Sequence, residues 1–293
     1  MSDTAAARPE VDRLALQRLR RRLDHAEALP WLHAEAARRM AERLPLIKLQ
    51  PQRVLDCSGA AGASAPWLQQ AYPDAEHRAL ADEAAPAAPR RWWRRRPQSP
   101  QAVTADQVAP GSADLLWSNM RLHWLAEPQA VLRRWHQALA VDGFLMFSTL
   151  GPGSLPELRE VYRANDWGEP FAPFVDMHDL GDMLAHAGFA DPVMDQELLT
   201  LSWPDADALL AELRGLGANV SNQRLAGLRT PRWRRRLADS LQAPDTHAGP
   251  GRPSLSVELV YGHAFRAAVR PRVQPETAVS LDAMRAMVRS PQR

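Results

Sequence analysis

The stretch Val54-Leu55-Asp56-Cys57-Ser58-Gly59-Ala60-Ala61-Gly62 decides the fold of this chain. Two apolar residues lead into an acid, and a run of small side chains follows. Residues 65–71 then predict a helix. A strand, a tight turn of small residues and a helix form the arrangement that brings backbone N–H groups close to a nucleotide-like ligand in α/β proteins. The same pattern also fits an ordinary buried turn between a strand and a helix.

The glycine pattern of this turn is incomplete. A strict fingerprint has glycine at positions 58, 60 and 62, whereas this chain has Ser58, Ala60 and Gly62. Glycine is favoured at such positions because it adopts positive φ and lets a ligand approach the backbone. We therefore expect strain at Ser58, at Ala60 or at both, and we predict that changing both to glycine tightens ligand binding. The competing interpretation is a turn that has relaxed to ordinary φ around a closed pocket.

The rest of the chain alternates between predicted strands and helices. The strands are apolar almost throughout, which predicts a parallel sheet covered by helices on both faces. After Gly151 the alternation gives way to a mainly helical region. The expected strands are 53–57, 77–81, 101–104, 114–119, 144–149, 191–203 and 254–268, and the expected helices are 11–28, 31–44, 65–71, 127–139, 155–162, 176–188 and 205–216.

Composition excludes several classes of protein. The 293 residues hold one cysteine, which rules out an internal disulfide or a cysteine-based zinc site and fits a reducing cytoplasm. No apolar run has transmembrane length, and residues 1–10 lack the core of a signal peptide. We expect a cytoplasmic protein with no membrane partner. The sequence also offers no metal-ligand spacing and no nucleophile elbow, so we predict neither a metal site nor a catalytic nucleophile.

Five stretches carry a resemblance to a known family. The chain resembles the class I S-adenosylmethionine-dependent methyltransferases, and within them the malonyl-acyl-carrier-protein O-methyltransferases of biotin synthesis. The stretches are ADLLWSNMRLHW at 113–124, FSTLGPGSLPELR at 147–159, FVDMHDLG at 174–181, LRGLGAN at 213–219 and VELVYGHA at 257–264.

The resemblance implies an α/β fold with a Rossmann-like sheet of seven strands, an antiparallel last strand and helices on both faces. It also implies a helical cap inserted after the fifth strand, at about 151–241. We accordingly expect an N-terminal helical extension at 1–30, a methyltransferase domain at 31–268 and a C-terminal tail at 269–293. The implied cofactor is S-adenosylmethionine, lying over the carboxyl ends of the strands.

The resemblance also implies roles for particular residues. The loop faces the methionine part of the cofactor, an acid at the end of the second strand approaches the ribose, and later residues approach the adenine and the transferred methyl group. For the acid, an ordinary surface turn is an equal alternative, because the expected spacing falls at Ala81. In chain order the implied cofactor residues are Asp56, Ser58, Gly59, Gly62, Asp82, Asp106 and Asn119.

The implied substrate is the free carboxylate of a malonyl thioester. A carboxylate is already ionised at neutral pH, so its methylation needs no strong base, only alignment and a cationic partner. Arg121 and Arg159 are the candidate partners, and His123 is a candidate wall of the substrate pocket. The alternatives are surface arginines and a histidine that packs in the core.

Two hypotheses from different classes remain open. The first is an active methyltransferase that acts on an acyl-carrier protein or another acyl thioester. The second is a pseudo-methyltransferase that keeps the fold and binds a partner. The segment Arg90–Arg96 holds five arginines around two tryptophans. It is either a solvated loop or a basic surface that speeds encounter with an acidic carrier protein. Nucleic-acid binding through it is a disfavoured third possibility, because no known nucleic-acid module surrounds it.

Overall fold

A computed structural model describes residues 11–24, 30–59, 63–80, 101–242 and 252–268. Its centre is one seven-stranded sheet with the order β3-β2-β1-β4-β5-β7-β6. β7 is antiparallel to both β5 and β6, and the remaining neighbours are parallel, which confirms the predicted sheet. The strands are β1 (Arg53–Asp56), β2 (Glu76–Leu80), β3 (Gln101–Val103), β4 (Ala113–Ser118), β5 (Leu139–Leu150), β6 (Ala190–Ser202) and β7 (Ser254–Phe265).

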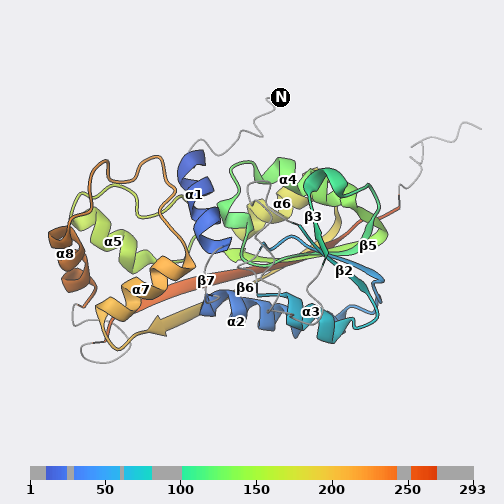
Figure 1. The fold of residues 1–293 in the computed structure, drawn as a ribbon, viewed down its shortest axis with the longest axis horizontal. Helices are drawn as coiled ribbons and strands as arrows, with labels where there is room; N and C mark the ends of the chain where they lie inside the picture. The colour runs from blue at the N-terminus through green and yellow to red at the C-terminus, as the bar shows by residue number, and fades with distance from the viewer. Residues whose placement is uncertain (1–10, 25–29, 60–62, 81–100, 243–251, 269–293) are drawn as a thin grey trace, which may run out of the picture.

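Helices cover both faces of the sheet (Figure 1). The helices α2 and α3 lie on one face, and α4 and α6 lie on the other. The α-helices are α1 (Arg13–Asp24), α2 (Trp31–Ala41), α3 (Ala65–Ala71), α4 (Pro128–Ala138), α5 (Pro156–Ala164), α6 (Met177–Ala187), α7 (Ala206–Leu216) and α8 (Pro231–Leu241). Short 3₁₀ turns include η1 (Leu44–Leu46), η3 (Ala105–Gln107) and η4 (Leu122–Trp124).

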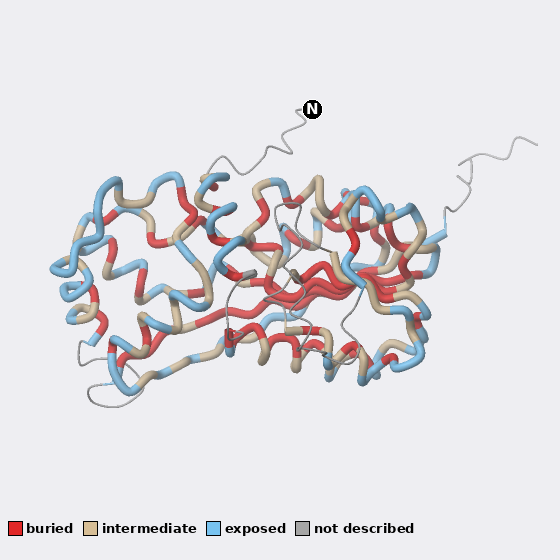
Figure 2. The backbone as a smooth tube through the Cα atoms, in the orientation of Figure 1, coloured by how far each residue is buried: buried red, intermediate tan, exposed pale blue. Residues whose placement is uncertain are grey.

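The central strands are apolar on both sides because both sides are covered. Along β4, Leu115 and Trp117 pack toward α2 and α3, whereas Leu116 packs toward α4 and α6. β5 alternates in the same way, with Phe144 on the first face and Phe147 on the second. All five side chains are inaccessible to solvent, and Figure 2 shows the buried backbone concentrated in these strands.

A long pair of strands carries the helical cap. β6 and β7 have 13 and 12 residues, and their far end reaches α5, α7 and α8 at the left of Figure 1. Leu158 of α5, Leu209 of α7, Leu237 of α8 and Leu255 of β7 share one core there. The range 151–241 is therefore not one continuous cap: α6 and β6 lie within it but pack in the main sheet layers.

The N-terminal helix α1 is attached to this cap. Its apolar side chains Leu16, Leu19 and Leu23 pack with Ala172 and Val220. An ion pair between Asp12 and Arg224 and a main-chain hydrogen bond from Asp12 to Val220 fix its start. α1 is thus part of the structure around the cap. Of the helices among the described residues, none combines the length and the apolar character that crossing a membrane requires.

Candidate functional site

A buried hydrogen-bond network joins the carboxyl ends of β1 and β4. The backbone N–H of Ser58 donates to Oδ1 of Asp56 at 2.8 Å, and the backbone N–H of Asn119 donates to Oγ of Ser58 at 2.8 Å. Asp56, Ser58 and Asn119 are all buried. The structure therefore brings together three of the residues predicted to face the cofactor, and it does so through their own hydrogen bonds.

The side chain of Asn119 extends this network to α2 and β5. Its Nδ2 donates to the carbonyl of His33 at 2.8 Å, and its Oδ1 accepts from Oγ of Ser148 at 2.5 Å. Each polar atom of the amide thus has a partner, which is the condition for burying an amide without a large penalty. The result is a rigid floor at the end of four adjacent elements.

The expected strain at Ser58 is not found. Ser58 is not among the described residues with positive φ, and the left-handed conformation falls on Gly59 at φ +77° and on Ala63 at φ +54°. The turn takes its left-handed conformation one residue later, at Gly59, and the Ser58 hydroxyl serves as an acceptor for the backbone N–H of Asn119. Gly59 is the position that requires glycine, because a Cβ there would also lie 3.1 Å from Nη1 of Arg121. Ala60 lies outside the described residues.

The electrostatics of the network centre on Asp56. Burial raises the pKa of its carboxyl to about 6, although the hydrogen bonds from Ser58 and the charges of Arg121 and His77 oppose the shift. Ionising this buried carboxyl therefore costs free energy, and a cationic group of a bound ligand would offset that cost. This property suits a carboxylate that receives the amino group of a ligand.

A cavity of about 630 Å³, here called the sheet cavity, lies over the strand ends. Leu55 and Cys57 line it from β1 and the turn after it, Leu80 from β2, and Ala105 from η3. Polar and cationic side chains also line it, from α1, from the segment after β4 and from α4: Gln17, Arg20, Arg21, Arg121, Arg134 and Gln137. A pocket of this size, with both apolar and cationic walls beside the carboxyl ends of parallel strands, suits a nucleoside-sized ligand.

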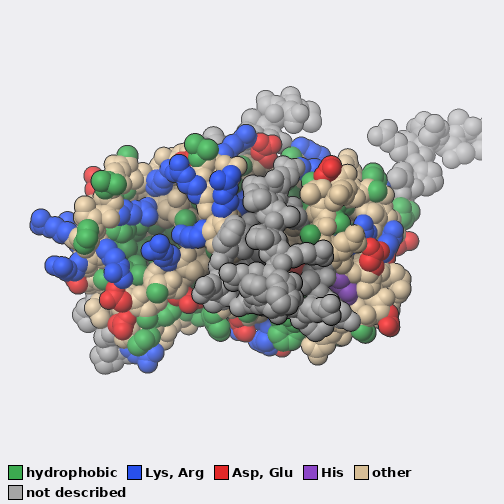
Figure 3. Space-filling view, viewed as in Figure 1, with side chains coloured by type: hydrophobic (Ala, Val, Ile, Leu, Met, Phe, Trp, Pro, Cys, Tyr) green, Lys and Arg blue, Asp and Glu red, His purple; other side chains and the backbone are tan. Residues whose placement is uncertain are grey.

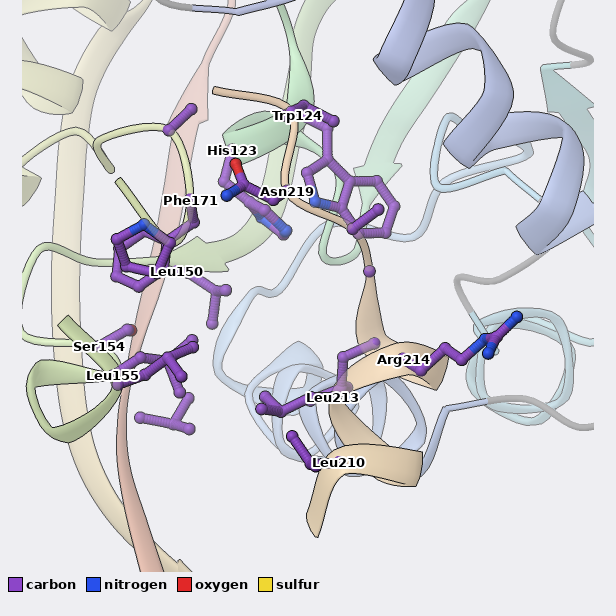
Figure 4. Close-up of a pocket in the computed structure, with 18 of the residues that line it drawn as sticks. His123, Trp124, Leu150, Ser154, Leu155, Phe171, Leu210, Leu213, Arg214 and Asn219 are labelled. Carbon is purple, nitrogen blue, oxygen red and sulfur yellow. The ribbon is translucent and has the colours of Figure 1, made fainter. Parts of the chain in front are cut away.

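A second cavity of about 430 Å³, here called the cap cavity, lies between the sheet and the cap. In Figure 4, Leu150 and Leu155 face Leu210 and Leu213 across it, and His123 and Trp124 close one end. Its walls are mainly apolar, so a group placed inside it is shielded from water. Trp233 lines the cavity, and its indole N–H is buried and has no hydrogen-bond partner in the described part of the chain.

The predicted substrate residues separate between these two cavities. His123 lines the cap cavity, with its Nδ1 3.3 Å from Oγ1 of Thr149. Arg121 lines the sheet cavity. Arg159 is exposed on α5 and lies over the ring of Phe171, at 5.0 Å, on the outside of the cap-cavity wall.

Asp106 lies on η3 after β3, exposed and apart from the residues that line either cavity. A hydrogen bond from the Thr104 side chain and local backbone N–H groups hold the pKa of its carboxyl below the usual value. It is ionised and accessible beside the sheet cavity, where Ala105 is the neighbouring wall residue. Gly62, Asp82 and the segment Arg90–Arg96 lie outside the described residues, so their predicted roles stay predictions.

Sequence reasoning missed several residues of the cap cavity. Arg22 comes from α1, Trp233 from α8 and Asn219 from the segment after α7. Asn219 lies within a stretch that carries the family resemblance, and that was a usable signal. Nothing in the local sequence links Arg22 or Trp233 to the end of β4. Within the part of the chain that the structure describes, His, Cys, Asp and Glu form no group that could hold a metal.

Comparisons with known proteins agree with this geometry. A family model described as a methyltransferase domain matches residues 29–191. The chain is 40% identical over 257 residues to the malonyl-[acyl-carrier protein] O-methyltransferase of Laribacter hongkongensis, covering 82% of this chain and 84% of that protein. It is 36% identical over 280 residues to the enzyme of the same name from Gallionella capsiferriformans, covering 92% and 95%. The solved YcgJ protein of Bacillus subtilis covers 80% of this chain and 99% of its own, with a TM-score of 0.53 and 12% identity, which is a likeness of fold alone.

Proposed function

Because the chain belongs to the family of malonyl-[acyl-carrier protein] O-methyltransferases, we propose that it methylates the free carboxylate of a malonyl thioester carried by an acyl-carrier protein, a step in biotin synthesis. S-adenosylmethionine is the proposed methyl donor. The observation that carries the proposal is the pair of cavities on either side of the segment 119–123. Arg121 lines the sheet cavity and Met120 and His123 line the cap cavity.

The sheet cavity supports a cofactor site. Gly59 lies next to Arg121, which lines the cavity, and a Cβ at Gly59 would lie 3.1 Å from Nη1 of that arginine. The raised pKa of Asp56 is the property expected of a buried carboxylate that awaits a cationic amino group. Leu55 and Leu80 offer apolar surface for a nucleoside. These residues fit S-adenosylmethionine: the apolar wall suits its adenosine, and Asp56, buried between the wall residues Leu55 and Cys57, suits its amino group.

The cap cavity supports an acceptor site. S-adenosylmethionine supplies a methyl group on a sulfonium sulfur, and its transfer to a carboxylate oxygen breaks the carbon–sulfur bond and leaves a neutral thioether. The acceptor carboxylate is already ionised, so no residue has to remove a proton. The task of His123, Trp124 and the facing leucines is to hold the acceptor in line with the methyl group and to exclude water.

A binding and activity assay tests this proposal. Calorimetry with S-adenosylmethionine and with S-adenosylhomocysteine should show a saturable site, and mass spectrometry should show one methyl group added to malonyl-acyl-carrier protein. A protein that binds neither compound, and methylates nothing, would instead be a pseudo-methyltransferase.

A pair of glycine variants provides the control. Gly59 and Gly111 both have positive φ, at +77° and +68°, but a Cβ at Gly111 would meet nothing within 4 Å. Gly59→Ala and Gly111→Ala should therefore each cost about 1–2 kcal/mol of stability. Only Gly59→Ala should also weaken S-adenosylmethionine binding, because it alone disturbs Arg121. Equal affinities in the two variants would argue against a cofactor at this turn.

A further inference from the structure

Arginine is concentrated at the cap end of the molecule. α1 contains five arginines and one aspartate, and α8 contains four arginines and one aspartate. Figure 3 shows these cationic side chains gathered over the end of the molecule formed by α1, α5, α7 and α8, with few acidic side chains between them. The net charge of the whole chain is only +2, so this surface is a local excess.

Four arginines at this end of the molecule form the rim of the cap cavity. They come from α1, from α7, from the segment before α8 and from α8 itself, and all four are exposed to solvent. They are Arg22, Arg214, Arg229 and Arg234.

The rim is only partly neutralised by the protein itself. Arg234 forms an ion pair with Asp207 at 2.7 Å. Arg22 donates to backbone carbonyls, those of Arg214 at 2.8 Å and of Gly217, and pairs with no carboxylate within the described ranges. Partial burial and the nearby charge of Arg214 lower the pKa of the Arg22 guanidinium. Like charges held close together are unfavourable unless an anionic partner arrives.

The interior behind this rim has a different character. Leu150, Leu155, Leu210 and Leu213 face one another there, and the partnerless indole N–H of Trp233 is a donor without an acceptor. His123 and Asn219 add further polar groups to this mainly apolar interior, which suits a slender arm that carries a carbonyl group. A cationic rim around such an interior suits the acidic body from which the arm extends.

We propose that the surface formed by α8 and the four rim arginines docks an acidic carrier protein, so that its thioester-bearing arm enters the cap cavity. This inference rests on the proposed function and names the docking face for its substrate. The carrier approaches from the cap end, and the malonyl group reaches the segment 119–123 from the side opposite the sheet cavity.

The test is a charge reversal outside the cavity. Arg232 and Arg235 are exposed on α8, and neither lines the cap cavity or forms an ion pair within the described residues. The double variant Arg232→Glu with Arg235→Glu should lower kcat/KM for malonyl-acyl-carrier protein by about tenfold or more at low salt, because electrostatic attraction speeds association. Methylation of malonyl-coenzyme A should stay near that of the parent protein, because its small body does not need the docking face.

A matched control carries the same change in net charge. Lys48 and Arg133 are exposed and belong to neither α1 nor the cap helices. The double variant Lys48→Glu with Arg133→Glu should leave carrier-protein kinetics within about twofold of the parent. If both double variants lose kcat/KM equally, or if the α8 variant loses none, the proposed docking face is wrong.

Direct binding separates this inference from the proposed function. Biolayer interferometry with the malonyl-loaded carrier protein should give an affinity that falls with salt in the parent and is weakened in the α8 variant. If the parent methylates neither thioester, the proposed function fails, and this titration still decides the docking face. If the parent methylates both thioesters and the α8 variant binds carrier as the parent does, only the docking face fails. The same titration is run with a single-stranded oligonucleotide. If the α8 variant loses affinity for the oligonucleotide but binds the carrier protein as the parent does, the surface binds nucleic acid instead.

Discussion

The buried hydrogen-bonded floor at the carboxyl ends of β1 and β4 and the walls of the cap cavity are built on opposite principles. The floor consists of buried polar groups, and Asn119, Ser58 and Asp56 satisfy one another over 2.5–2.8 Å with the help of Ser148. The walls of the cap cavity consist of leucines and aromatic rings that touch but form few hydrogen bonds. The first arrangement fixes geometry, and the second provides shape and dryness. The difference implies that substitutions in the floor change stability and cofactor binding, whereas substitutions in the cap change the binding of the acceptor substrate.

The largest effect is expected from Asn119→Ala. The variant removes two buried hydrogen bonds and leaves the carbonyl of His33 and the hydroxyl of Ser148 without their partner. We expect a loss of about 2–4 kcal/mol in the free energy of unfolding, measured with urea. Asn165→Ala in the cap, which removes a single bond to the carbonyl of Val161, should cost less than half as much. Similar losses in both variants would remove the distinction between the two regions.

The next effect is expected from Ser58→Gly. The hydroxyl of Ser58 accepts the N–H of Asn119, so its removal should cost about 1–2 kcal/mol. Because Ser58 does not adopt positive φ, we no longer expect glycine at this position to tighten cofactor binding. Urea unfolding and a titration with S-adenosylmethionine, run on parent and variant, measure the two quantities. Tighter binding in Ser58→Gly would instead support the strained turn predicted from the sequence.

The pH dependence of cofactor binding sharpens the comparison further. With its pKa raised to about 6 by burial, the Asp56 carboxyl is ionised above that pH and protonated below it. A cationic ligand group favours the ionised form, so affinity for S-adenosylmethionine should be level above pH 6 and fall by about tenfold per pH unit below it. Calorimetry across pH 5–8 measures the profile. Asp56→Asn should bind more weakly at pH 7 and show no such fall, and a sloping profile in that variant would assign the titration to another group.

The smallest effect is expected in the cap, from Trp233→Phe. The ring packing with Tyr162 and Trp167 is kept, while the partnerless N–H is removed. Stability should be unchanged or slightly improved, since no hydrogen bond is lost. If the indole donates to the arm of the substrate, KM for the malonyl thioester should rise about threefold to tenfold with S-adenosylmethionine affinity unaffected. Unchanged kinetics would mean that the cap cavity recognises the substrate by its shape, without a hydrogen bond from Trp233.

The sheet could be predicted from sequence because local patterns determine it. Strands such as β4 and β5 are apolar on both faces, and turns of small residues separate them from amphipathic helices. The cap could not be delimited in the same way. Residues 176–188 and 191–203 are predicted as another helix and strand inside the predicted cap, and periodicity does not say in which layer an element packs. The structure extends β5 back to Leu139, beyond the predicted start at residue 144, and Asp142 has φ +64° inside this strand.

The candidate site was predicted in part for a related reason. Asp56 ends β1, Gly59 lies in the turn after it and Asn119 follows β4, and the ends of parallel strands meet at one edge of a sheet. Their convergence could therefore be expected. Arg22 and Trp233 reach the cap cavity from helices more than two hundred residues apart in sequence, and only tertiary packing brings them together. Arg121 illustrates a third limit of sequence-based prediction. It lines the sheet cavity, whereas its neighbour Met120 lines the cap cavity, and the sequence does not indicate which of the two cavities each side chain faces.

The position of β7 has a consequence for synthesis of the chain. β7 lies between β5 and β6 and bonds to both, yet residues 254–265 leave the ribosome after every other strand. Until then the ladder edge of β5, which carries Phe144 and Phe147, has no partner on that side. An apolar strand edge of this kind recruits other chains. Translation that stops before residue 254 should therefore yield an aggregating fragment, and the nascent protein depends on its last strand to complete the sheet.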